Sequence, residues 1–141
     1  MLKGIPALLN ADVLYVLAAM GHGDELAVVD RNFPATSVAK RLVRLDGTDL
    51  CTAGRAILSL FPLDTFVAEP VTRMEIVGDP DTVPDVQNDF VRLAEDAEGR
   101  PLGVGSLERH AFYARAREAF AVIATAESRP YGCFLLTKGV L

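Results

Sequence analysis

Apolar residues along the chain fall into short blocks with two kinds of spacing. Blocks in which apolar residues recur three and four positions apart predict amphipathic helices, and blocks of consecutive or alternating apolar residues predict strands. By this criterion we expect helices at residues 11–20, 50–61, 84–97 and 108–119. We expect strands at residues 25–30, 41–45, 71–77, 103–107, 120–125 and 133–137.

The alternation of strands and helices predicts an α/β fold. Several expected strands, such as residues 120–125, are apolar almost throughout, which is typical of strands buried on both faces of a sheet. We therefore expect one sheet with helices covering both of its faces. The 141 residues match the length of one ordinary domain, so residues 1–141 are expected to form a single domain.

Individual residues mark the expected boundaries of these elements. Asn10 is expected to cap the first helix, and Gly21 is expected to end it in a left-handed conformation. Pro84 suits position N1 of a helix, and Gly99 is expected to end that helix. Residues 32–35 predict a loop, because the proline within them restricts the residue before it.

Composition narrows the class of protein. Half of the residues are hydrophobic and 23% are charged, which is typical of a chain that folds around a core. Lys plus Arg number 14 against 19 Asp plus Glu, and the resulting net charge of −5 argues against a nucleic acid partner. The longest apolar run, residues 13–20, is far shorter than the roughly 20 residues that a membrane span needs. The cysteines, Cys51 and Cys133, form no C-x-x-C pair, so we expect no zinc site and a reduced, cytoplasmic protein.

The segment Gly21-His22-Gly23 is the first candidate for chemistry. The two glycines leave the imidazole accessible and allow a ligand to approach the backbone. The alternative is that His22 is only a cation favoured by the dipole at a helix C-terminus. The second histidine, His110, is expected to lie on the solvated surface at the start of a helix.

Other polar residues stand at the ends of the expected elements. Asp30 ends a strand as either a loop cap or a ligand group, and Asp64 is either a turn-capping residue or part of a site. Arg109 and Tyr113 share one helical face, as a surface ion pair with a packed ring or as donors to hydroxyl groups. Tyr131 lies on a turn between two strands. With no phosphate-binding motif present, this set suits acid–base work on a neutral, hydroxyl-rich small molecule.

Six motifs in this order make the chain resemble the L-fucose mutarotase and D-ribose pyranase family, over residues 3–141. The motifs are residues 20–25 (MGHGDE) followed by Asp30 and Phe33-Pro34, residues 62–64 (PLD), residues 108–113 (ERHAFY), residues 119–125 (AFAVIAT), Tyr131-Gly132, and residues 138–140 (KGV). The helix that carries Arg109, Phe112 and Tyr113 is similar to that of the fucose mutarotase branch.

The resemblance implies an epimerisation of a monosaccharide at its anomeric carbon, without a metal or cofactor. Proton transfer would then involve His22 as the proton donor, with Asp64 and Tyr113 as further catalytic residues. The substrate-binding positions of the family would fall on Asp30, Met74, Arg109, Tyr131, Gly132 and Cys133. The resemblance also implies a ring-like homo-oligomer, a decamer or another ring, with sites between neighbouring subunits.

The chain departs from the family pattern at two positions. Cys133 stands where the family usually has Asn, and a thiol offers far weaker hydrogen bonds than an amide. Ala126 stands where a glycine is usual, and alanine does not enter positive φ cheaply. Both changes bear on the affinity for the sugar and on which sugar is preferred.

We therefore predict a mutarotase that acts on L-fucose or a related monosaccharide. A D-ribose pyranase is the alternative within the same family, because both reactions open the sugar ring. A monosaccharide-binding module without catalysis and a ring-forming scaffold without a ligand are the alternatives from other classes of protein.

Overall fold

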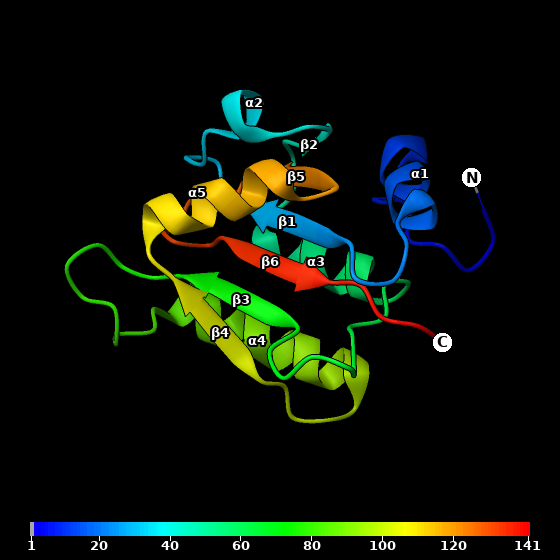
Figure 1. Cartoon of the computed structure of the whole chain (residues 1–141). Coiled ribbons are helices and arrows are strands. Elements are labelled where there is room, and N and C mark those ends of the chain that lie inside the picture. The colour runs from blue at the N-terminus through cyan, green and yellow to red at the C-terminus, as the bar shows by residue number, and fades with distance from the viewer. Residues whose placement is uncertain (1) are drawn as a thin grey trace.

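Six strands form one mixed sheet with the order β2-β5-β1-β6-β3-β4 (Figure 1). The computed structural model describes residues 2–141. Neighbouring strands run parallel except that β6 is antiparallel to both β1 and β3. The strands are β1 Glu25–Val29, β2 Leu42–Leu45, β3 Val71–Met74, β4 Val104–Leu107, β5 Ala121–Thr125 and β6 Phe134–Thr137.

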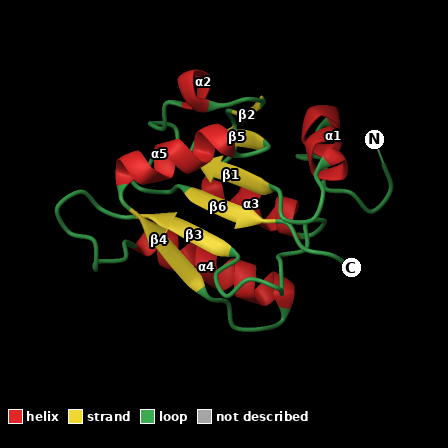
Figure 2. Cartoon of the chain, in the orientation of Figure 1, coloured by secondary structure: helices red, strands yellow, loops and turns green. Residues whose placement is uncertain are grey.

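Helices cover both faces of this sheet, so the predicted α/β architecture is confirmed. The helices are α1 Ala11–Ala19, α2 Ala35–Val38, α3 Leu50–Leu58, α4 Asp85–Glu98 and α5 Arg109–Glu118. Figure 2 shows α5 in front of the sheet and α3 and α4 behind it. No helix within residues 2–141 has the length and apolar character that crossing a membrane requires.

The hydrophobic core consists of two layers, one on each face of the sheet. Leu26 and Val28 of β1 point into the layer shared with α1, α3 and α4, whereas Ala27 and Val29 point into the layer shared with α2 and α5. This is the alternation expected of a strand, and both sets are apolar because both faces are covered. In the first layer, the Phe90 ring of α4 stacks on Phe134 of β6 with centroids 4.2 Å apart.

Two predicted boundaries are confirmed and one is displaced. The Asn10 side chain accepts a hydrogen bond from the Val13 N–H at 3.0 Å, which caps α1. Gly99 ends α4 in the left-handed region at φ 68°. Pro84 is the N-cap of α4 rather than its first helical residue, because helical backbone begins at Asp85.

The prediction that Gly21 ends α1 in a left-handed conformation is wrong. The helix ends at Ala19, and its C-cap residue Met20 has an extended backbone. In the loop that follows, the residue with positive φ is Gly23, at 86°. The Lys138 ammonium donates to the carbonyls of Leu17 and Met20 at 2.7 and 2.6 Å. A charged side chain from the far end of the chain thus satisfies the carbonyls that a left-handed glycine was expected to close off.

Residues 32–38 also differ from the prediction, which placed a loop at residues 32–35. The chain forms one turn of helix, α2, directly after Pro34. Four residues are too few to show a helical repeat of apolar positions, so the pattern carried no signal for this element. The strand predicted at residues 71–77 stops at Met74, and the chain leaves the sheet in a loop that leads to α4.

Candidate active site

The residues predicted to form a site lie in two groups at opposite ends of the sheet. Asp30 directly follows the last residue of β1, whereas His22 precedes its first residue. A strand rises about 3.3 Å per residue, so the five residues of β1 separate the two groups by about 16 Å. A single chain therefore does not bring His22 and Asp30 to one small ligand.

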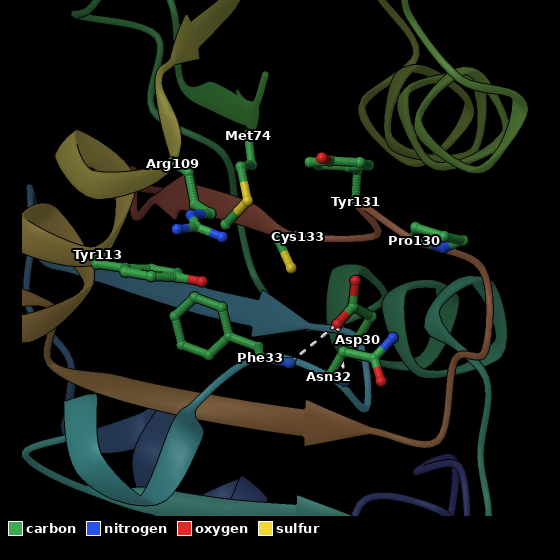
Figure 3. A pocket seen from close by; sticks show the side chains of 9 residues that line it. All are labelled: Asp30, Asn32, Phe33, Met74, Arg109, Tyr113, Pro130, Tyr131 and Cys133. Atoms are coloured by element: carbon green, nitrogen blue, oxygen red, sulfur yellow. Dashed lines mark hydrogen bonds between the residues drawn. The ribbon is translucent and has the colours of Figure 1, made fainter. Parts of the chain in front are cut away.

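The first group surrounds a cavity of about 260 Å³ (Figure 3). It lies where β1 and β3 end, which is the edge where open α/β sheets usually bind ligands. Six residues of the predicted site line it, with Asn32, Phe33 and Pro130 beside them. The six are Asp30, Met74, Arg109, Tyr113, Tyr131 and Cys133.

Asp30 is both a loop cap and a wall of this cavity. Its side chain is buried, with the residue 4% exposed. One carboxylate oxygen accepts hydrogen bonds from the N–H groups of Asn32 and Phe33 at 2.9 and 3.0 Å, and the other accepts from the Gly132 N–H at 3.2 Å. Burial raises the pKa of the Asp30 carboxyl above its usual value, and these hydrogen bonds oppose the rise. The predicted residue Gly132 thus contributes through its backbone rather than as a wall.

Cys133 is buried next to Asp30. Burial and the neighbouring carboxylate raise the pKa of the Cys133 thiol well above its usual value, so the thiol stays neutral. Figure 3 shows its sulfur directed toward the cavity. A neutral thiol at this position presents a mostly apolar surface to a ligand.

Arg109 and Tyr113 extend from the first turns of α5 toward the same cavity (Figure 3). The Arg109 guanidinium lies 5.9 Å from the centroid of the Tyr113 ring, which packs edge-on against Phe33 at 5.3 Å. Arg109 takes part in none of the ion pairs found within residues 2–141. Its Nη2 lies 3.4 Å from His110 Nε2, and the guanidinium has further donors for a ligand, which favours hydroxyl binding over a surface ion pair.

The second group pairs His22 with Asp64. His22 Nε2 lies 3.1 Å from Asp64 Oδ1, across 42 positions of sequence. Asp64 is 2% exposed and also accepts a hydrogen bond from the Phe66 N–H at 3.1 Å, which is the predicted turn-capping contact. The bond from Phe66 and the contact with His22 lower the pKa of the Asp64 carboxyl, so it stays ionised.

The contact with Asp64 favours a functional role for His22 over the alternative that it is only a cation at a helix C-terminus. A carboxylate that accepts from one ring nitrogen fixes the tautomer and leaves the other nitrogen for a reacting partner. The His22 side chain is 41% exposed, so the ring is accessible from outside the chain. The histidine predicted to lie on the surface, His110, is exposed at the start of α5.

Sequence reasoning missed two residues near these groups. Phe66 packs edge-on against the His22 ring at 5.2 Å and is itself 73% exposed, but an aromatic residue in a loop gave no signal. Gln87 is fully buried behind the cavity, where its amide donates to the backbone of Met74 and Tyr131. The sequence could have indicated Gln87, because it lies on the buried face of α4 with Phe90 and Ala94. A buried glutamine needs hydrogen-bond partners inside the protein.

The residues described here contain no group of three or more His, Cys, Asp or Glu side chains arranged to hold a metal ion. The model of the RbsD / FucU transport protein family matches residues 3–141. The chain belongs to this family.

Two relatives of this RbsD / FucU chain match it over almost its whole length. The fucose mutarotase of Homo sapiens is 42% identical over 146 residues, covering 99% of this chain and 94% of the relative. The crystal structure of the fucose mutarotase from Streptococcus pneumoniae in complex with L-fucose is 35% identical, covers 99% of both chains and gives a TM-score of 0.92.

A third structure shares the fold of the family at greater distance. The Bacillus subtilis RbsD complexed with D-ribose is 22% identical, covers 100% of this chain and 99% of its own, and gives a TM-score of 0.76. The expected resemblance to the family is confirmed, and the similarity is greater toward the proteins named fucose mutarotases.

Proposed function

We propose that the protein is an L-fucose mutarotase, an isomerase that interconverts the α and β anomers of the sugar. The observation that carries the proposal is the convergence of Asp30, Arg109 and Tyr113 on one cavity at the end of the sheet. Its volume of about 260 Å³ is just below the roughly 300 Å³ at which pockets for drug-sized ligands begin, which suits a monosaccharide. The identity to fucose mutarotases over the whole chain supports the same substrate.

The reaction needs two proton transfers and nothing else. The anomeric hydroxyl loses its proton as the bond from C1 to the ring oxygen breaks, and the ring oxygen gains a proton, which gives the open-chain aldehyde. Rotation about the C1–C2 bond followed by the reverse transfers closes the ring with the other configuration. Positioned acid–base groups accelerate such steps by roughly 10²- to 10⁴-fold.

We assign the proton given to the ring oxygen to His22, since imidazole is the side chain whose ordinary pKa lies closest to neutral pH. Asp64 holds its tautomer through the 3.1 Å contact. Tyr113, whose hydroxyl faces the cavity, handles the second proton. Asp30 and Arg109 then bind sugar hydroxyls, with Met74, Tyr131 and Cys133 as the remaining walls and Gly132 holding Asp30 in place.

These roles require two copies of the chain, because the length of β1 separates His22 from the cavity. We propose that His22 and Asp64 of one copy close over the cavity of its neighbour in a ring-like homo-oligomer. Phe66 and Val67, 73% and 43% exposed beside Asp64, give this end of the molecule an apolar surface for such a contact. A contact between two different surfaces of the same chain closes into a ring when the rotation allows it.

Proton NMR saturation transfer between the anomers tests the activity directly, with L-fucose and D-ribose in parallel. We expect exchange of L-fucose above the buffer rate and its loss in His22→Ala. Exchange with D-ribose alone would make the protein a ribose pyranase. Sugar binding without exchange would make the protein a monosaccharide-binding module. If it showed neither binding nor exchange, the ring-forming scaffold without a ligand would be the remaining alternative.

Mixing two inactive variants tests whether the site is shared. His22→Ala and Tyr113→Phe oligomers are dissociated, mixed in equal amounts and reassembled. If each site takes its residues from two copies, about a quarter of the sites in the mixture are intact and exchange returns. If one chain carries the whole site, no intact site forms and the mixture stays inactive. Light scattering on the wild type gives the size of the oligomer.

We also propose that the protein works in the cytoplasm. Cys51 and Cys133 are both free, which fits a reducing compartment. Fractionation of the source cells, followed by detection with an antibody, checks this assignment. Recovery outside the cytoplasmic fraction contradicts it.

A further inference from the structure

Tyr131 adopts a backbone conformation that its side chain disfavours. Within residues 2–141 it is the one non-glycine residue with positive φ, at 64°. A residue with a Cβ persists in this region only where its surroundings hold it there. The turn of residues 130–133 that contains Tyr131 forms one wall of the sugar cavity. What holds Tyr131 therefore shapes the cavity.

The buried amide of Gln87 makes the contact that holds this turn. Gln87 is 0% exposed, and its Nε2 donates to the carbonyl of Tyr131 at 2.8 Å and to the carbonyl of Met74 at 2.7 Å. Both amide hydrogens are thereby used on residues that line the cavity. Its Oε1 accepts a longer bond of 3.4 Å from the Arg73 guanidinium, which completes the side chain's partners.

The rest of the turn is held from other directions. The Gly132 N–H donates to Asp30 at 3.2 Å, and the Tyr131 hydroxyl accepts from the Val77 N–H at 3.2 Å. The space beside Gly132 is nearly full, since a Cβ there would lie 3.3 Å from Val86. The Tyr131 carbonyl and the Gly132 N–H belong to one peptide group, so Gln87 and Asp30 hold that peptide from its two sides. Removing Gln87 leaves the carbonyl side of this peptide without its hydrogen bond.

We propose that Gln87 is a positioning residue of the sugar site, which keeps Tyr131 left-handed and so sets the walls around Asp30. This inference rests on the proposed function, because that function identifies the cavity as a sugar site. The arrangement of the turn can nevertheless be tested without measuring activity. Gln87 touches no part of the cavity itself, so it acts through Tyr131 and Met74.

Gln87→Met keeps the size of the side chain and removes both donors and the acceptor. Gln87→Glu keeps the acceptor toward Arg73 and removes the donors, and it takes the place of the first variant if that variant does not fold. Leu93→Ala is the matched control, because Leu93 is buried on the same helix, six positions after Gln87.

Two readouts separate positioning from simple destabilisation. In saturation transfer at increasing L-fucose concentration, we expect the Gln87 variants to raise KM about tenfold while kcat stays within about twofold, the pattern of lost binding. In ¹⁵N–¹H spectra of the folded variants, the amide resonances of Val77 and Gly132 should move. The Val77 N–H loses the position of its acceptor, the Tyr131 hydroxyl, and the Gly132 N–H moves relative to Asp30. Leu93→Ala should lower stability and leave KM and both resonances unchanged.

Wild-type KM in a folded Gln87 variant, or the same rise in KM in Leu93→Ala, overturns the positioning role. Unmoved Val77 and Gly132 resonances overturn it as well. If the wild type itself does not accelerate exchange, the proposed function fails, while the two amide resonances still decide whether Gln87 holds the turn.

Discussion

His22 Nε2 and Asp64 Oδ1 lie 3.1 Å apart although they come from loops 42 positions apart in the sequence. The carboxylate is buried and the imidazole is half exposed, so a buried anion holds a ring that remains accessible. The loop of Asp64 is fixed beside the end of β6 by the backbone bridge between Leu63 and Lys138. The Gly23 N–H donates to the Lys138 carbonyl at 2.8 Å and fixes the loop of His22 to the same strand end.

Replacing Asp64 by Asn should slow the reaction without unfolding the protein. The amide keeps the size of the side chain, but it no longer selects one tautomer of His22 by charge. We expect kcat for L-fucose exchange to fall about tenfold, less than the roughly 10²-fold or greater loss expected for His22→Ala. Equal kcat in Asp64→Asn and the wild type would separate this carboxylate from catalysis.

The same carboxylate should make stability depend on acidity. The pKa of Asp64 is lowered in the folded chain, by the Phe66 N–H bond and then by His22. Its contribution to stability is therefore present above the ordinary carboxyl pKa of about 3.9 and is lost as the pH falls through the lower, folded pKa. Urea unfolding from pH 6 to pH 3 should show a smaller loss of unfolding free energy in Asp64→Asn than in the wild type. A parallel loss in both proteins contradicts the assignment.

Cys133→Asn should strengthen the binding of L-fucose. The buried thiol lines the cavity and offers weak hydrogen bonds, whereas an amide brings two donors and an acceptor. We expect KM to fall about tenfold, as one added hydrogen bond to a hydroxyl group allows. Cys133→Ala, which also removes the thiol but adds no polar group, should leave KM within about twofold. A KM that rises in Cys133→Asn would show that the chain uses the apolar thiol to favour another sugar.

Gly139→Ala should displace Asp64 and so disturb its contact with His22. A Cβ at residue 139 would lie 2.7 Å from the Leu63 carbonyl oxygen and 2.8 Å from Asp64 Cα, so the backbone that carries Asp64 must shift. Overpacking of this kind costs about 1–3 kcal/mol of unfolding free energy. We expect such a loss in urea unfolding together with slower exchange. Gly47→Ala is the control, because nothing lies within 4 Å of its Cβ position, and it should change neither quantity.

The local pattern was sufficient for most elements of secondary structure. The apolar run of residues 120–125 became the fully buried strand β5, and Asn10 and Gly99 bounded their helices as expected. These features depend on neighbours within a few residues, which the sequence displays directly. The pattern failed at α2, a single turn, and at Gly21, where a lysine 117 positions later closes the helix end.

For the candidate site, too, the sequence indicated the residue types, whereas the tertiary structure decided how they are grouped. The types of residue near its motifs, an accessible histidine, carboxylates, an arginine and tyrosines, were apparent from sequence, and the resemblance assigned them one reaction. Their grouping depended on the strand order β2-β5-β1-β6-β3-β4, in which β6 lies between β1 and β3 and runs against both. That order places the turn of Tyr131 beside Asp30 and carries Lys138 back to His22 and Asp64 at the other end. Periodicity reports which face of an element is buried, but strand order follows from contacts between distant segments, which only the folded chain makes.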